Sequence, residues 1–210
     1  MTLTRDAYLR RHGVVVLAAG NSKRLGRPKA LIEMEGETLV HRATRLALET
    51  LPGECIVVSA GNREAIDAAV AGLDCRVVAC VDAALGMSAS LRCGLRSLDS
   101  DCAAALIVLV DQPALSALHL CALRDAWRQH PELAAASQYA DTIGVPAMLP
   151  RSWFDQLIKS NGDKGARELL RSRRNEVNPI AAPMLAEDVD TLADLLRLES
   201  MHVSKQDVLP

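Results

Sequence analysis

Short apolar runs alternate with helix-like segments over the first 130 residues, and this alternation constrains the fold more than any other feature. The run Val14–Leu17 has no polar alternation, which is typical of a strand buried on both faces. Ala104–Val110 is a second such run and predicts a central strand. Between them, apolar residues recur at helical spacing, as in Thr38–Leu51. This β-α-β-α order predicts an α/β fold, with helices on both faces of a mostly parallel, Rossmann-like sheet in three layers.

Further elements follow from the same patterns. Strands are expected at 55–59 and 76–80, and helices at 63–71, 88–98 and 116–130. Asn62 is expected to cap the helix 63–71, and Gly72 to end it.

The second part of the chain departs from this order. Segments 133–139 and 145–149 are expected to form a hairpin or a small antiparallel insertion. Helices at 153–159 and 164–173, a short strand at 177–180 and a closing helix at 191–198 complete the expected elements. No repeat or flexible linker divides the chain, so one domain is expected over residues 13–198, with tails at 1–12 and 199–210.

The charge balance and composition exclude several classes of function. Lysine plus arginine (24) nearly cancel aspartate plus glutamate (26), which argues against a nucleic-acid-binding surface. Only five aromatic residues occur (two Trp, two Tyr and one Phe), too few to form stacking platforms for single strands. No apolar run approaches the roughly 20 residues that span a bilayer, and residues 1–12 do not resemble a signal peptide. A cytoplasmic protein with no nucleic-acid or membrane partner is expected.

Cysteines and histidines offer no metal site or nucleophile pattern. The six cysteines include no C-x-x-C pair and lie mostly in apolar stretches, so they are expected to be reduced and buried. None of the five histidines neighbours a candidate nucleophile, and all are expected at the surface or its boundary: His12, His41, His119, His130 and His202.

The loop Ala18–Lys29, which follows the first strand, has the parts of an anion site. A loop at the carboxyl end of a buried strand is where open α/β sheets bind ligands. Gly20 and Gly26 permit close backbone approach and positive φ, and successive N–H groups can form an anion-binding nest. Arg24 offers a bidentate fork and Lys29 a point charge. The alternative is a solvated basic turn.

The loop as a whole resembles the G-x-x-x-R-x-G-x-x-K signature of sugar-nucleotide-like nucleotidyltransferases. Its flanks, Leu17–Gly20 and Pro28–Leu31, resemble the MobA-like NTP transferases and, within them, the molybdenum cofactor cytidylyltransferases. Three later segments are similar to motifs of the same family: Gly86–Leu95, Val110–Leu115, and Gly162–Arg167 with Asp188–Thr191. The resemblance covers about residues 13–196. It implies a nucleotide half at about 13–115 and an acceptor half at about 116–198.

The resemblance implies roles for individual residues. Arg24, Lys29 and Asp111 would be catalytic, the two cations countering charge on the leaving pyrophosphate. The implied nucleotide-binding residues are Leu17, Ala18, Ala19, Gly20, Ser22, Arg24, Gly26, Lys29, Gly86, Ser88 and Ser90.

Asp111 and Asp190 are the expected Mg²⁺ ligands. Asp111 follows the most buried strand, so it faces the ligand crevice, and Mg²⁺ prefers carboxylate and phosphate oxygens. The alternative role for Asp111 is to satisfy backbone donors near the next helix. Asp190 is also placed to cap the helix 191–198, and Asp188, two residues earlier, is the other candidate ligand.

Several motif residues keep two interpretations. Ser88 is expected either to contact base or ribose or to cap its helix, and Gln112 to orient base or acceptor. Asp163 and Arg167, four apart, either pair on a helix face or bind the acceptor. Val145 stands where the family often has a polar residue, which weakens the case for an acceptor contact at that position.

The resemblance implies the Mg²⁺-dependent transfer of CMP from CTP to the terminal phosphate of molybdopterin, with release of pyrophosphate. CTP is favoured because Ala19 occupies the position where the guanylyl branch has glycine. By the same resemblance, partners would be a molybdenum-inserting protein or a molybdoenzyme apoprotein. The alternatives are the same transfer with GTP or to another phosphorylated acceptor, a non-catalytic cofactor carrier, and an NTP-sensing domain.

Overall fold

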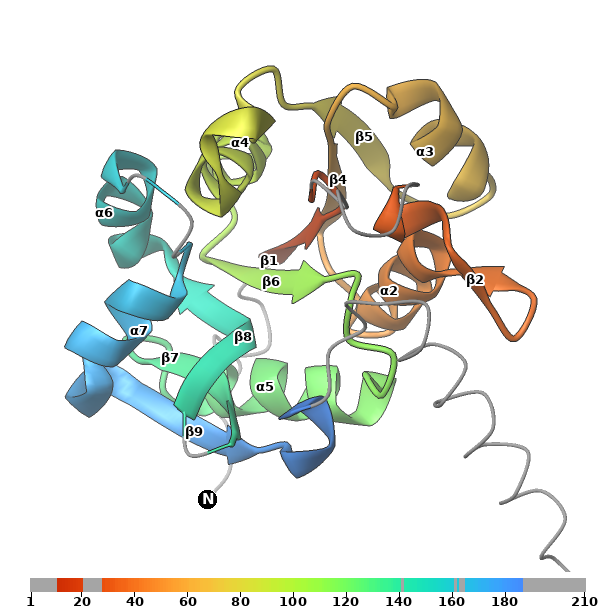
Figure 1. Cartoon of the computed structure of the whole chain (residues 1–210). Coiled ribbons are helices and arrows are strands. Elements are labelled where there is room, and N and C mark those ends of the chain that lie inside the picture. Colours follow the sequence, from red (N-terminus) through yellow and green to blue (C-terminus); the bar gives the residue numbers. More distant parts are fainter. Residues whose placement is uncertain (1–10, 21–27, 141, 161, 163–164, 187–210) are drawn as a thin grey trace, which may run out of the picture.

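A computed structural model describes residues 11–20, 28–140, 142–160, 162 and 165–186 of the 210-residue chain (Figure 1). The elements expected outside these ranges, including the helix at 191–198 and both tails apart from residues 11 and 12, are therefore not described.

A seven-stranded sheet in the order β5-β4-β1-β6-β8-β7-β9 forms the centre of the protein. Pairs β1–β4, β1–β6, β4–β5 and β7–β9 are parallel, whereas β8 is antiparallel to both of its neighbours, β6 and β7. The mostly parallel sheet with an antiparallel insertion is thus confirmed. The strands are β1 (His12–Leu17), β4 (Glu54–Ser59), β5 (Arg76–Ala79), β6 (Ala104–Leu109), β7 (Ala134–Tyr139), β8 (Thr142–Pro150) and β9 (Val177–Ala181). Strands β2 (Glu33–Met34) and β3 (Glu37–Thr38) form a separate two-stranded sheet.

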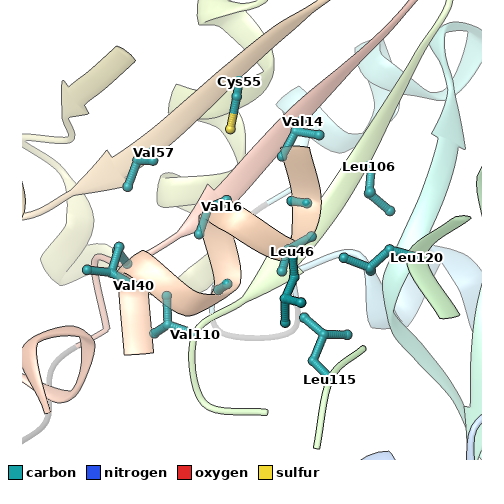
Figure 2. Close-up of a cluster of buried hydrophobic side chains, with 14 of the residues drawn as sticks. Val14, Val16, Val40, Leu46, Cys55, Val57, Leu106, Val110, Leu115 and Leu120 are labelled. Carbon is teal, nitrogen blue, oxygen red and sulfur yellow. The ribbon is translucent and has the colours of Figure 1, made fainter. Parts of the chain in front are cut away.

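Helices cover both faces of this sheet, as the alternation predicted. The helices are α2 (Leu39–Leu48), α3 (Arg63–Ala69), α4 (Met87–Ser97), α5 (Ala117–Gln129), α6 (Phe154–Lys159) and α7 (Arg167–Ser172). Apolar residues of α2, α3 and α5 join one core cluster, and those of α4, α6 and α7 join a second. Figure 2 shows part of the first cluster, with Val40 and Leu46 of α2 close to Val16 of β1. Short 3₁₀ turns are η1 (Lys29–Leu31), η2 (Ala83–Leu85), η3 (Arg151–Trp153), η4 (Arg174–Glu176) and η5 (Pro183–Ala186).

Local capping explains where two of the helices begin. Thr38 Oγ1 accepts a hydrogen bond from the His41 amide at 3.3 Å, and Ser116 Oγ accepts one from the His119 amide at 3.3 Å. Asn62 precedes α3 as expected, but its side chain makes no capping hydrogen bond. Gly72 follows α3 with φ +86°, a conformation that favours glycine.

The surface assignment of the histidines is wrong for two of the five. His12 is 1% exposed because β1 begins two residues earlier than expected and carries it into the core. His119 is 8% exposed because it lies on the buried face of α5. Burial lowers the pKa of both imidazoles.

The cysteines follow the sequence expectation more closely. All six are free thiols; Cys55, Cys80 and Cys102 are buried and the other three partly buried. Burial raises the pKa of Cys102 to about 12 and that of Cys93 to about 11, so these thiols stay protonated. No helix in the part of the chain that the structure describes is long and apolar enough to cross a bilayer.

Candidate active site

The carboxyl ends of the parallel strands bring the first and third sequence motifs to one edge of the sheet. Ala18–Gly20 follow β1, and Asp111 lies two residues beyond β6, the neighbour of β1. The amide of Ala18 donates to the carbonyl of Val58 on β4 at 2.9 Å, which extends the pairing into the loop. This is the edge at which open α/β sheets bind ligands.

Lys29 and Asp111 meet at this edge although 82 positions separate them in the chain. Lys29 Nζ lies 3.3 Å from Asp111 Oδ2, and the two side chains are 15% and 28% exposed. The other carboxylate oxygen, Oδ1, is buried and has no hydrogen-bond partner. Asp111 does not cap α5, since Ser116 holds that position. A capping role for Asp111 therefore has no support. The Lys29 ammonium and the Asp111 carboxylate lie together at the edge of the sheet where ligands bind.

The loop Ala18–Lys29 is described only at its two ends. Leu17, Ala18 and Ala19 are buried and Gly20 is exposed. Gly20 does not adopt the positive φ expected of it, and a Cβ there would meet no described atom within 4 Å, so the described part of the chain gives no steric reason for glycine at this position. The expected contributors Ser22, Arg24 and Gly26 lie outside the described residues, as do Asp188 and Asp190.

The Gly86–Leu95 motif spans the start of α4. Gly86 precedes the helix with φ +109°, which explains the glycine. Ser88 does not cap the helix: the capping position is Gly86, and Ser88 is 1% exposed with an unpartnered Oγ. Ser90 is also buried, at 5% exposure. Neither hydroxyl faces open solvent, so a nucleoside at this edge would first meet the backbone of Gly86 and the 40% exposed side chain of Met87.

The start of α4 also contacts the Gly162–Arg167 motif of the acceptor half. The Ser88 amide donates to the carbonyl of Gly162 at 3.1 Å, and Arg92 donates to the carbonyl of Ser160 at 3.4 Å. A Cβ on Gly165 would approach Met87 Sδ to 3.0 Å. These contacts were not predicted, although the glycines at 162 and 165, both at positive φ, were the available signal. Asp163 lies outside the described residues, so its pairing with Arg167 stays a prediction.

A buried polar network includes Gln112, the residue that follows Asp111. The sequence patterns did not predict it. Gln112 Nε2 donates to the Val145 carbonyl at 3.1 Å, and the Tyr139 hydroxyl donates to the same oxygen at 3.0 Å. Ser137 Oγ donates to the next carbonyl, that of Pro146, at 2.7 Å, and lies 2.8 Å from His119 Nε2. Because the hydroxyl proton of Ser137 is used for Pro146, His119 Nε2 must be the donor to Ser137. Val145 therefore contributes to the site through its backbone.

The donor set fits a magnesium ion in part. Mg²⁺ usually takes one or two protein carboxylates and completes its shell with substrate phosphates and water. Asp111 offers one such carboxylate, with the orphaned Oδ1 available as a ligand atom. Within the described ranges, no three histidine, cysteine, aspartate or glutamate side chains cluster as a metal cage would require. An ion held jointly with a nucleotide fits these residues better than a resident structural metal.

Comparison with known proteins decides the family. The model of the MobA-like NTP transferase domain matches residues 14–177. The chain belongs to this family. It is a nucleotidyltransferase, and the family assignment made from the four motifs is confirmed.

The named proteins to which the chain is similar have names that describe different functions. "Nicotine blue oxidoreductase" of Paenarthrobacter nicotinovorans is 33% identical over 88% of this chain and 94% of its own length. "Probable molybdenum cofactor guanylyltransferase" of Rhodopirellula baltica is 33% identical over 86% of this chain and 88% of its own. "Purine catabolism protein PucB" of Bacillus subtilis is 30% identical over 75% and 80%.

Solved structures share the whole fold. Rv0371c of Mycobacterium tuberculosis superposes with a TM-score of 0.79 at 30% identity, covering 90% of this chain and 98% of its own. A structure of Rv0371c in complex with manganese has a TM-score of 0.73. A nucleotidyl transferase from Methanothermobacter, 23% identical over 93% of this chain and 99% of its own, has a TM-score of 0.77 and shows the fold alone.

Proposed function

We propose that this nucleotidyltransferase transfers CMP from CTP to the terminal phosphate of molybdopterin in a Mg²⁺-dependent reaction that releases pyrophosphate. The observation that carries the proposal is the pairing of Lys29 with Asp111 at the carboxyl ends of β1 and β6. A cation and a carboxylate side by side at that edge suit a metal-bound triphosphate, because each neutralises charge of the opposite sign on the ligand complex.

The chain's own groups position the reactants. Because the Ala18 amide is bonded to Val58, the backbone N–H groups of Ala19 and Gly20 are the ones at the end of β1 that would bind the phosphates. An oxygen of the acceptor phosphate attacks the α-phosphorus of CTP, and the bond to the β-phosphate oxygen breaks. Lys29, with Arg24, counters the negative charge that then collects on pyrophosphate.

Asp111 and Asp190 would hold the Mg²⁺, with Asp188 as the other candidate for the second position. When bound, the ion neutralises phosphate charge and orients the triphosphate for in-line displacement. The manganese-bound structure of the relative Rv0371c supports a divalent metal in a chain of this fold.

The choice of CTP rests on Ala19. This residue is 6% exposed and belongs to the apolar cluster that also contains Ala89 and Leu91 of the Gly86–Leu95 motif. Less room at that position favours a pyrimidine over a purine. The guanylyltransferase name of the Rhodopirellula relative supports GTP as the second candidate.

The acceptor is proposed from the family and from that relative. A molybdenum-inserting protein or a molybdoenzyme apoprotein would then be the partner that supplies or receives the cofactor. A carrier without catalysis would have no need for the paired Lys29 and Asp111 in addition to a binding loop. An NTP-sensing domain would bind the nucleotide without turnover with any acceptor.

A thermal-shift panel with CTP, GTP, ATP and UTP, each with and without Mg²⁺, tests the nucleotide and the metal. Ligand at 100 times its dissociation constant adds about 2.7 kcal/mol to the free energy of unfolding, which raises the midpoint by several degrees. A shift confined to CTP with Mg²⁺ supports the proposal. A larger shift with GTP overturns the base assignment and leaves the mechanism intact.

Pyrophosphate release then tests the acceptor. Wild-type protein is incubated with CTP, Mg²⁺ and molybdenum-loaded molybdopterin, with Asp111→Asn as the inactive control. Release that depends on the acceptor supports the transfer. CTP binding without any release points to a carrier or sensor, and release only with a sugar phosphate or polyol phosphate identifies another acceptor class.

A further inference from the structure

The backbone pairing of β6 with β8 is shorter than its pairing with β1. Pairing with β1 continues to Leu17 and Leu109, near the end of the strand. Pairing with β8 ends earlier, at Ile107 and Ala147. Continuing that register places Val108 opposite Pro146, which has no N–H to donate. The backbone ladder on this side therefore stops before the turn that carries Asp111.

The side chain of Gln112 joins this turn to β8 where the ladder does not. Gln112 directly follows Asp111 and is 4% exposed. Its Nε2 donates to the carbonyl of Val145, the residue before Pro146, at 3.1 Å. The amide group thereby takes the place of a missing backbone hydrogen bond between the two strands.

We propose that Gln112 is a positioning residue for Asp111, and that its hydrogen bond to Val145 sets where the carboxylate stands for the metal-nucleotide complex. This inference rests on the metal role proposed above for Asp111. It assigns to Gln112 an action through the metal ligand, instead of the contact with base or acceptor that the motif suggested. Residues that orient metal ligands from behind commonly change metal affinity when they are replaced.

The structure contains a matched control for this proposal. Tyr139 donates to the same Val145 oxygen at 3.0 Å, but from β7, which is not attached to the turn of Asp111. Gln112→Met and Tyr139→Phe each remove one donor to that carbonyl. Both variants should therefore lower the thermal midpoint, Gln112→Met by less, because it also removes the buried and unpartnered Oε1 of Gln112. Only the first should change the metal site.

The measurement is Mn²⁺ binding in the presence of a non-hydrolysable CTP analogue, followed by electron paramagnetic resonance of the free ion. Gln112→Met is expected to raise the Mn²⁺ dissociation constant roughly tenfold, and Tyr139→Phe to leave it within about twofold. Turnover at saturating metal supplies a second readout. It should recover in Gln112→Met as Mn²⁺ is raised, whereas a general folding defect would not respond to metal.

The outcomes separate this proposal from the one on which it rests. Loss of Mn²⁺ binding in Asp111→Asn together with wild-type affinity in Gln112→Met overturns the positioning role alone. Wild-type affinity in Asp111→Asn removes the metal role of Asp111, and with it the proposed mechanism. Equal weakening in Gln112→Met and Tyr139→Phe shows that the carbonyl network acts only on the fold.

Discussion

Lys29 Nζ lies 3.3 Å from Asp111 Oδ2, so the proposed leaving-group cation and the proposed metal ligand neutralise each other before any substrate binds. In the proposed mechanism, binding of a metal-nucleotide complex would separate this pair, because Asp111 would hold the metal and Lys29 the phosphates. On that proposal, part of the binding energy would be used to separate Lys29 from Asp111.

Lys29→Ala should change metal binding and turnover in opposite directions. Without the Lys29 ammonium, Asp111 loses the cation that pairs with it, so Mn²⁺ binding in the absence of nucleotide should tighten. Turnover at saturating CTP should fall by at least about tenfold, because the charge on pyrophosphate loses a counter-ion. Electron paramagnetic resonance and pyrophosphate release measure the two quantities. Lys159→Ala, at an exposed position at the end of α6, is the control and should change neither. Unchanged turnover in Lys29→Ala would remove Lys29 from the mechanism.

Asp190→Ala and Asp188→Ala should differ in their effect on the metal. If Asp190 is the second ligand, its replacement weakens Mn²⁺ binding to the CTP-bound protein, while Asp188→Ala stays near wild type. The same resonance titration compares the two variants side by side. The opposite order would transfer the assignment to Asp188.

Ala19→Gly should shift the nucleotide preference toward GTP. Removal of the buried methyl group enlarges the space beside the start of α4, and one methyl group in a pocket changes selectivity by roughly 10-fold or more. The ratio of CTP to GTP dissociation constants, measured by thermal shift or calorimetry, tests this. An unaltered ratio would mean that base selection lies elsewhere in the site.

His12 should make the protein less stable as the pH falls below neutrality. Burial, with smaller contributions from Arg128 and Arg124, lowers the pKa of His12 from its usual 6.5 to about 4. Between these values the unfolded chain binds a proton that the folded chain does not, so the free energy of unfolding rises with pH. The difference corresponds to about 3 kcal/mol, lost progressively from pH 6.5 down to pH 4.

Urea unfolding at several pH values tests this assignment. His12 Nε2 lies 3.0 Å from Thr50 Oγ1, which itself donates to the Ala47 carbonyl, so the neutral imidazole is the donor to Thr50. His12→Gln keeps a donor and should flatten the pH dependence in that interval, while the exposed His130→Gln should leave it unchanged. An equally steep dependence in His12→Gln would assign it to other groups, His119 first among them, since burial lowers its pKa as well.

Gly94→Ala should destabilise the protein through the contact between α4 and the sheet. A Cβ at Gly94 would collide with the side chain of Val15 and lie 3.1 Å from Val58 Cγ2. Overpacking of this kind costs about 1–3 kcal/mol, and each kcal/mol lowers the midpoint by roughly 2–4 °C in a chain of this length. Gly61→Ala is the control, because its Cβ would meet no atom within 4 Å. A midpoint equal to that of the control would show that α4 moves freely on the sheet.

Much of the fold could be predicted from local patterns. The buried strand at Val14–Leu17, the helix capped by Thr38 and the β7–β8 hairpin follow from periodicity and capping over a few residues. The errors arose where packing overrides local pattern. His119 looked like a surface residue because polar residues usually are, yet the face of α5 that meets the sheet buries it.

By itself, the sequence determined the order of strands and helices and the family, because apolar periodicity and short motifs act over neighbouring residues. It also named Lys29 and Asp111 as separate candidates. Only the tertiary structure decided that these two side chains pair and that Gln112 is tied to Val145, 33 positions away. Those contacts depend on which strands are neighbours and on the register in which they pair. Both are set by the packing of the whole chain, and no local segment of the sequence specifies them.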